Sequence, residues 1–338
     1  MATLVVQTSF LGDVVLTTPL IAALGRRGPV DVLTTAPGAQ VLANNPEIRN
    51  TIVYDKRDRD RGIRAFMRIV GQLRQNRYDA AYLAQGSFRS GALVVAAGIP
   101  TRVGFDTSAA RMLYTNRVQY RADKHHAERL WSLGFTDCAD PPVGDQTMPR
   151  VFPGEDDRRS VDALLGKIGT QQFVALGPGS AWGTKRWPFY PELAAKIVAD
   201  FHIVVIGGKS DVEAGNLILA QLPPGRGLNA AGQLSLLGSA EIIGRATALV
   251  SNDSAPQHFA SAMGTPTITI FGPTTEAFGF GPLAPGSESI GHPDLPCRPC
   301  HRHGPARCPL GHWRCMRELS SDVVHEILLR MISTSKKA

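Results

Sequence analysis

The first half of the chain alternates short apolar runs with longer stretches in which apolar residues recur every three to four positions. The short runs predict strands at Thr3–Thr8, Pro29–Thr34, Thr51–Tyr54, Ala80–Leu83 and Arg102–Gly104. The longer stretches predict helices at Asp13–Leu24, Gln40–Asn44, Ile63–Arg74 and Gly91–Ala97. Strands that alternate with helices are typical of a parallel sheet covered by helices.

The same alternation restarts in the second half of the chain, without sequence similarity to the first. Strands are predicted at Phe173–Leu176, His202–Ile206, Ala248–Ser251 and Thr267–Phe271, and a loop at Gly272–Pro296. Helices are predicted at Glu155–Lys167, Pro191–Asp200, Asp211–Gln221, Ser235–Arg245, Ser254–Met263 and Asp322–Met331.

Six Pro and Gly residues within residues 141–154 separate the two halves and predict a connector that serves as a hinge. We therefore expect one domain at 1–154, a second at 155–320, and a terminal helix at 321–338. The predicted fold class is α/β, with two doubly wound, Rossmann-like domains that face each other across a cleft. Ligands of such open sheets bind beyond the carboxyl ends of the strands, so the loops at these ends are the places to look for chemistry.

Composition and charge narrow the choice of partner. The 338 residues are 43% hydrophobic and 19% charged, which suits folded domains and excludes wholesale disorder. No apolar stretch is long enough for a membrane span, and the N-terminus resembles a strand more than a signal peptide, so we expect a cytoplasmic protein. A net charge of +7 favours anionic partners. Aromatic residues are only 7% and are not interleaved with Arg and Lys, so nucleic acid is not an expected partner.

The loop Ser9–Asp13 links the first predicted strand to the first predicted helix. Asp13 stands at the helix start, where it is either an ordinary N-terminal cap or a general base at the mouth of the cleft.

A second loop, Gly177–Pro188, follows an apolar strand and contains Gly179, Ser180, Lys185 and Arg186. Its small residues let backbone amides approach phosphate oxygens, and its two cations add positive charge. The loop fits neither the P-loop nor the dinucleotide-binding glycine spacing. It is either a phosphate site or a glycine-rich connector with solvated basic residues.

A third loop, Val250–His258, again connects a strand to a helix. The amides of Ser254 and Ala255 are placed to hold a pyrophosphate at the helix start. Asp253 and His258 are candidate site residues; the alternative makes Asp253 a cap and His258 a half-buried helix residue.

Four of the five cysteines gather near the C-terminus, at Cys297, Cys300, Cys308 and Cys315, while Cys138 stands alone. In a reducing compartment such thiols bind zinc or an iron–sulfur cluster, or they pack as reduced side chains. The spacing matches no standard zinc ribbon. A separate basic run, Arg57, Arg59, Arg61 and Arg64, is either a solvated loop or a site that captures a phosphorylated acceptor.

Four motifs occur in order along nearly the whole chain, and together they resemble glycosyltransferase family 9, the lipopolysaccharide heptosyltransferases. They are Leu11–Val14, Gly177–Pro188, Asn252–His258 with Gly264–Pro266, and Phe271–Thr274. The segment from Cys308 to Arg317 is most similar to the enzymes that add the second heptose.

The resemblance implies a GT-B fold with the acceptor on the N-terminal domain, the nucleotide-sugar on the C-terminal domain, and a terminal helix that crosses back to the N-terminal domain. It implies an inverting transfer from ADP-L-glycero-β-D-manno-heptose to a lipid A–core oligosaccharide, with no catalytic metal. Such a lipid-linked acceptor, together with the basic charge, suggests peripheral contact with the inner face of the cytoplasmic membrane.

The resemblance also implies roles for particular residues. Asp13 matches the family's proposed base, and Lys185 matches a group that neutralises the donor phosphates. The remaining implied donor contacts are Gly179, Ser180, Asp253, Ser254, Ala255 and His258, with Asp211 or Glu213 at the ribose. Two alternatives stay open: a GT-B enzyme that uses or epimerises another nucleotide-sugar, and a non-catalytic nucleotide-sugar-binding protein.

Overall fold

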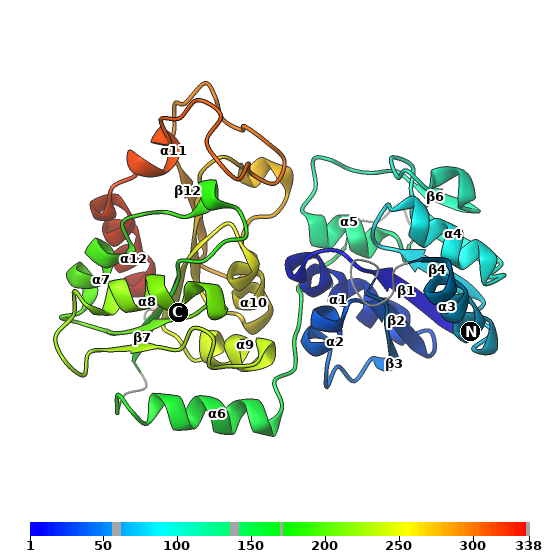
Figure 1. Cartoon of the computed structure of the whole chain (residues 1–338), viewed down its shortest axis with the longest axis horizontal. Coiled ribbons are helices and arrows are strands. Elements are labelled where there is room, and N and C mark those ends of the chain that lie inside the picture. Colours follow the sequence, from blue (N-terminus) through cyan, green and yellow to red (C-terminus); the bar gives the residue numbers. More distant parts are fainter. Residues whose placement is uncertain (56–61, 136–141, 170–171, 336–338) are drawn as a thin grey trace. The chain divides into compact units, whose positions relative to one another are not determined.

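The computed structural model describes residues 1–55, 62–135, 142–169 and 172–335. The chain divides into two compact units, Met1–Phe152 and Pro153–Ala338 (Figure 1). The division lies inside the predicted connector, at 152 rather than 154. No helix in the described part of the chain combines the length and the apolar character that crossing a bilayer requires.

The first unit holds a six-stranded parallel sheet in the order β3-β2-β1-β4-β5-β6. The central strands are buried on both faces, which is why they consist of nearly continuous apolar runs. One core cluster of this unit brings the strands together with α3 and α4. The elements are β1 Thr3–Gln7, α1 Leu11–Gly25, β2 Val30–Thr34, α2 Ala36–Val41, β3 Ile48–Val53, α3 Gly62–Gln75, β4 Ala80–Leu83, α4 Phe88–Ala96, β5 Thr101–Phe105, β6 Asn116–Val118 and α5 His126–Ser132.

The second unit repeats this topology in a sheet ordered β12-β11-β10-β7-β8-β9, again all parallel. In both sheets the first and fourth strands of the unit are neighbours at the centre. This is the order of the dinucleotide-binding fold, and it confirms the predicted fold class. The elements are α6 Glu155–Leu165, β7 Phe173–Gly177, α7 Tyr190–Ile197, β8 His202–Val205, α8 Val212–Leu219, β9 Gly227–Asn229, α9 Leu236–Gly244, β10 Ala248–Asn252, α10 Ala255–Met263, β11 Thr267–Phe271, β12 Glu288–Gly291, α11 Arg314–Arg317 and α12 Ser321–Ser335.

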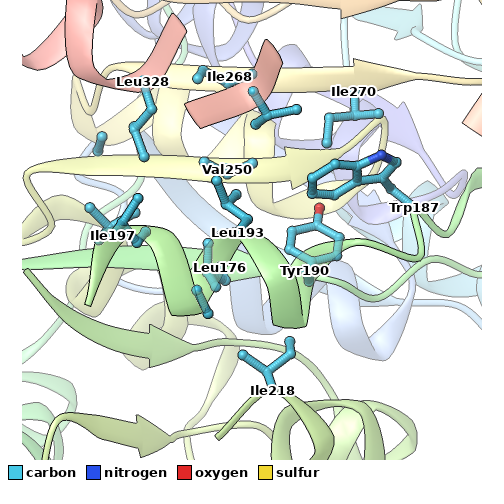
Figure 2. Close-up of a cluster of buried hydrophobic side chains, with 14 of the residues drawn as sticks. Leu176, Trp187, Tyr190, Leu193, Ile197, Ile218, Val250, Ile268, Ile270 and Leu328 are labelled. Carbon is cyan, nitrogen blue, oxygen red and sulfur yellow. The ribbon is translucent and has the colours of Figure 1, made fainter. Parts of the chain in front are cut away.

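The main core of the second unit lies between its sheet and the helices α7, α8 and α12 (Figure 2). Trp187 and Tyr190 meet edge to face there, with ring centroids 5.1 Å apart. The indole Nε1 of Trp187 donates to the carbonyl of Leu319 at 2.8 Å, which fixes the segment before α12. The loop that precedes Trp187 is therefore anchored at its end in a rigid core.

The terminal helix α12 packs on the sheet of the second unit. Its buried residues Val324, Leu328, Met331 and Ile332 all belong to the core of the second unit. Its apolar face covers α7 and β11, and Lys196 of α7 pairs with Asp322 at 2.6 Å. These side chains complete the cover of the second sheet, and the expectation that the helix crosses back to the first unit stays a prediction.

Replacing Leu328 with alanine should lower the free energy of unfolding of the second unit by about 2–5 kcal/mol, because the fully buried side chain leaves a cavity. Leu329, its exposed neighbour on the same helix, is the matched control, and Leu329→Ala should change that free energy by less than about 0.5 kcal/mol. Chemical denaturation followed by tryptophan fluorescence measures both. Equal midpoints for the two variants would contradict this placement of α12.

Candidate active site

The two central strands of the second sheet, β7 and β10, each end in a loop, and these loops meet through an ion pair. Lys185, in the loop after β7, places its Nζ 2.5 Å from Oδ2 of Asp253, in the loop after β10. The two side chains are only 9% and 11% exposed. This is the point at which the strand order of the sheet reverses, where ligands of doubly wound folds bind.

Hydrogen bonds hold the carboxylate of Asp253 in a single orientation. Its Oδ2 also accepts from the hydroxyl of Thr274 at 2.7 Å, and its Oδ1 accepts from the amide of Gln257 at 3.0 Å. The side-chain carbonyl oxygen of Gln257 in turn accepts from the hydroxyl of Thr269 at 3.0 Å. A carboxylate with this many partners is fixed in place, so the prediction that Asp253 is a plain helix cap is not what the structure shows.

Asn252, which precedes Asp253, connects the two loops through hydrogen bonds. Its side chain accepts from the backbone amide of Trp187 at 3.1 Å and donates to the carbonyl of Pro178 at 2.8 Å. Both bonds are buried. The glycine-rich loop is thereby fixed at both ends, which gives Lys185 a defined position without help from a ligand.

The helix α10 starts next to this pair. Ser254 is its N-cap residue and Ala255 its first residue, and the cap carries no side-chain hydrogen bond to the helix. First-turn amides of a helix lack intrahelical acceptors and carry partial positive charge, so this end suits an anion. His258 is buried in the second turn and meets Phe280 at 6.4 Å between ring centroids.

Other predicted phosphate contacts serve the loop itself. Ser180 is buried, and its hydroxyl accepts from the amide of Trp182 at 3.2 Å. The guanidinium of Arg186 donates two bonds to the carbonyl of Ser180, at 3.0 and 2.9 Å. Arg186 therefore stabilises the conformation of the loop, whereas Lys185 is the cation that pairs with Asp253.

The end of β8 brings one of the two ribose candidates to the loop after β7. Asp211 accepts from the amide of Gly208 at 2.8 Å, and its carboxyl group lies so near Gly179 that a Cβ there would approach it to 2.5 Å. Only glycine fits this close approach. Glu213, by contrast, is exposed on α8. The structure thus brings Asp211 to the loop and leaves Glu213 outside it.

The segment from Cys297 to Cys315, here called the Cys segment, covers Lys185. Gly304 has a φ of +82°, and a Cβ there would lie 3.2 Å from Cε of Lys185. Thr184 donates to the carbonyl of Pro305, and Trp313 Nε1 donates to the carbonyl of Thr184 at 3.0 Å. The Cys segment therefore packs on the same turn that carries Lys185.

The four clustered cysteines are free thiols. Cys297 Sγ lies 3.9 Å from Nε2 of His312, and Cys300 Sγ donates to the carbonyl of Cys297 at 3.0 Å. Burial, followed by the nearby thiol of Cys300, raises the pKa of Cys315 to about 11. Within the described residues, no group of three or more His, Cys, Asp or Glu side chains is arranged to hold a metal ion. Cys138 lies outside those residues.

In the first unit, Asp13 is the third residue of α1, whose N-cap is Phe10, so Asp13 is not the cap. Its Oδ1 lies 3.5 Å from Nε2 of His126, the first residue of α5, and both side chains are largely buried. At the same end of the sheet, Gln85 after β4 donates to Thr8 after β1 at 2.8 Å. Asp13 therefore stands at the strand-order reversal of the first sheet.

Arg64 is exposed in the first turn of α3, whereas Arg57, Arg59 and Arg61 lie outside the described residues. Sequence reasoning did not single out His126, because it missed α5, and it gave no role to Asn252, Gln257 or Thr274 individually. Asn252, Gln257 and Thr274 could have been found from the sequence only as members of the motifs Asn252–His258 and Phe271–Thr274.

The chain is similar to known glycosyltransferases in both sequence and fold. Residues 66–311 match the model of glycosyltransferase family 9 (heptosyltransferase). Lipopolysaccharide heptosyltransferase 2 of Escherichia coli K12 is 29% identical over 296 residues, covering 82% of this chain and 84% of that protein. Lipopolysaccharide heptosyltransferase 1 of Pseudomonas aeruginosa is 29% identical over 322 residues, covering 89% and 86%. The solved structure of E. coli ADP-heptose lps heptosyltransferase II shares the fold, with a TM-score of 0.80, 24% identity and coverage of 99% and 100%.

Proposed function

Because this chain belongs to glycosyltransferase family 9, we propose that it transfers heptose from ADP-L-glycero-β-D-manno-heptose to the inner core of lipopolysaccharide. The observation that carries the proposal is the Lys185–Asp253 pair at the strand-order reversal of the second sheet, beside the start of α10. The relatives named as heptosyltransferase 2 favour addition of the second heptose.

The donor diphosphate is assigned to Lys185 and the first-turn amides of α10 at Ser254 and Ala255. The leaving ADP gains negative charge as its bond to the anomeric carbon breaks, and a fixed cation and helix amides stabilise that charge without reorganising. Asp253 keeps Lys185 in place and lies where the donor sugar is expected. Gly179 and Ser180 supply the loop backbone, and His258 lies one turn further along α10.

The ribose is assigned to Asp211 rather than Glu213, because only the Asp211 carboxylate lies against the loop after β7. A carboxylate beyond the second strand of a Rossmann-like unit accepts hydrogen bonds from ribose hydroxyls.

The general base is assigned to Asp13. It takes the proton of the acceptor hydroxyl while that oxygen forms a bond to the anomeric carbon from the face opposite to ADP, so the anomeric configuration inverts. His126 lies 3.5 Å from Oδ1 of Asp13 and holds the carboxylate in position at the start of α1. Arg57, Arg59, Arg61 and Arg64 are assigned to phosphate groups of a lipid A–core acceptor, which brings the protein to the inner face of the membrane as a peripheral partner.

Incubation of the purified chain with ADP-heptose and defined acceptors, followed by mass spectrometry, tests this function. We expect a product one heptosyl unit heavier from an acceptor that already carries one heptose. Transfer to the heptose-free acceptor instead would assign the first step. Turnover only with another nucleotide-sugar, or binding of ADP with no transfer to any acceptor, would contradict the proposal.

A further inference from the structure

The outward face of α3 carries apolar and basic side chains in adjacent strips. Ile63 and Met67 lie four residues apart and are 71% and 52% exposed. Arg64 and Arg68, also four apart, are exposed beside them. The opposite face holds Ile69, Val70 and Leu73 in the core, so helix packing does not account for the exposed apolar residues.

Further large apolar side chains are exposed at the same edge of the first sheet. Phe10 follows β1 and is 48% exposed, and Phe88 follows β4 and is 62% exposed. Since the carboxyl ends of parallel strands meet at one edge of a sheet, these residues share that edge with the start of α3. The helices α3 and α4 pack against each other (Figure 1).

The charge of these helices has one sign. Residues 62–77 contain Arg64, Arg68, Arg74 and Arg77 and no Asp or Glu, and α4 also lacks acidic residues. In the second unit, two of the exposed apolar residues stand directly beside acidic ones, Val212 beside Glu213 and Val323 beside Asp322. A helix with apolar residues next to arginines and without carboxylates is suited to the interface of an anionic bilayer.

We propose that the exposed face of α3, with Phe10 and Phe88, docks the protein on an anionic lipid bilayer. Apolar side chains enter the headgroup boundary, and the net positive charge of α3 attracts the anionic lipid surface. The proposal deepens the proposed function, since it assigns to one surface the membrane contact that a lipid-linked acceptor requires. Docking itself needs neither donor nor transfer.

Cosedimentation of the full chain with vesicles tests the docking. The chain should bind vesicles of phosphatidylglycerol and phosphatidylethanolamine, fail to bind phosphatidylcholine vesicles, and lose binding as salt rises. The variant Ile63→Ser with Met67→Ser should bind anionic vesicles about tenfold more weakly. The control Leu217→Ser with Leu329→Ser, at exposed apolar positions of the second unit, should bind like the unchanged chain.

Equal binding of both double variants, or absence of binding by the unchanged chain, would overturn the proposal. An activity measurement separates docking from catalysis. The α3 variant should act normally on a deacylated, water-soluble acceptor and slowly on an acceptor embedded in vesicles. If no acceptor is modified but vesicle binding still depends on Ile63 and Met67, docking is supported and the proposed heptose transfer is not.

Discussion

Replacing Lys185 with methionine is expected to lower kcat by about 10²–10³, because the leaving diphosphate loses its fixed cation. The same change leaves the carboxylate of Asp253 buried without its cation, so the second unit should also lose stability, by about 3–5 kcal/mol. Steady-state kinetics with ADP-heptose and urea denaturation measure the two effects on one preparation.

A double variant separates chemistry from folding. Lys185→Met with Asp253→Asn removes both charges, while the amide can still contact Thr274 and Gln257. We expect stability to recover largely, because no uncompensated charge remains, and turnover to stay low. Recovery of turnover together with stability would reduce Lys185 to a structural partner of Asp253 and remove it from the mechanism.

Asp13→Asn is expected to lower kcat by about 10²–10⁴, since asparagine cannot accept the acceptor's proton. Binding of ADP, measured by calorimetry, should stay unchanged, because Asp13 belongs to the first unit and the proposed donor contacts belong to the second. Asparagine keeps nearly the same shape, so packing of α1 against α5 is preserved.

The matched control is Asp123→Asn, which removes a carboxylate of the same unit that forms an exposed pair with Arg121. Exposed pairs contribute little to stability, and this one lies outside the proposed site, so activity should be unchanged. Turnover of Asp13→Asn near that of the control would show that another group takes the proton.

The sequence predicted the central strands well and the edge strands poorly, for a physical reason. Strands such as β1 and β10 are buried on both faces and therefore appear as apolar runs. The strands β6, β9 and β12 are three or four residues long, lie at sheet edges, and have partly exposed side chains. They lack such a run, so β12 was predicted as part of a loop, and β6 and β9 were not predicted.

The sequence predicted which loops form the candidate site, but it did not predict which side chains within them contact one another. Strand–loop–helix transitions located Asp13, Lys185 and Asp253, because Gly and Pro mark such turns in the sequence. The pairing of Lys185 with Asp253 depends on β7 and β10 being neighbours, which follows from the strand order and not from local pattern. The contact between Asp13 and His126 depends on the packing of α5 on α1, and no sequence motif predicts that packing.

The two units follow one another along the chain, and α12 stays with the second, so the polypeptide passes between them once. A protease that cut this single passage would yield two fragments, each with its complete sheet. The proposed proton acceptor would then belong to one polypeptide and the proposed diphosphate cation to the other. Neither fragment alone would support turnover, and mixing them would make any restored activity depend on the concentration of both.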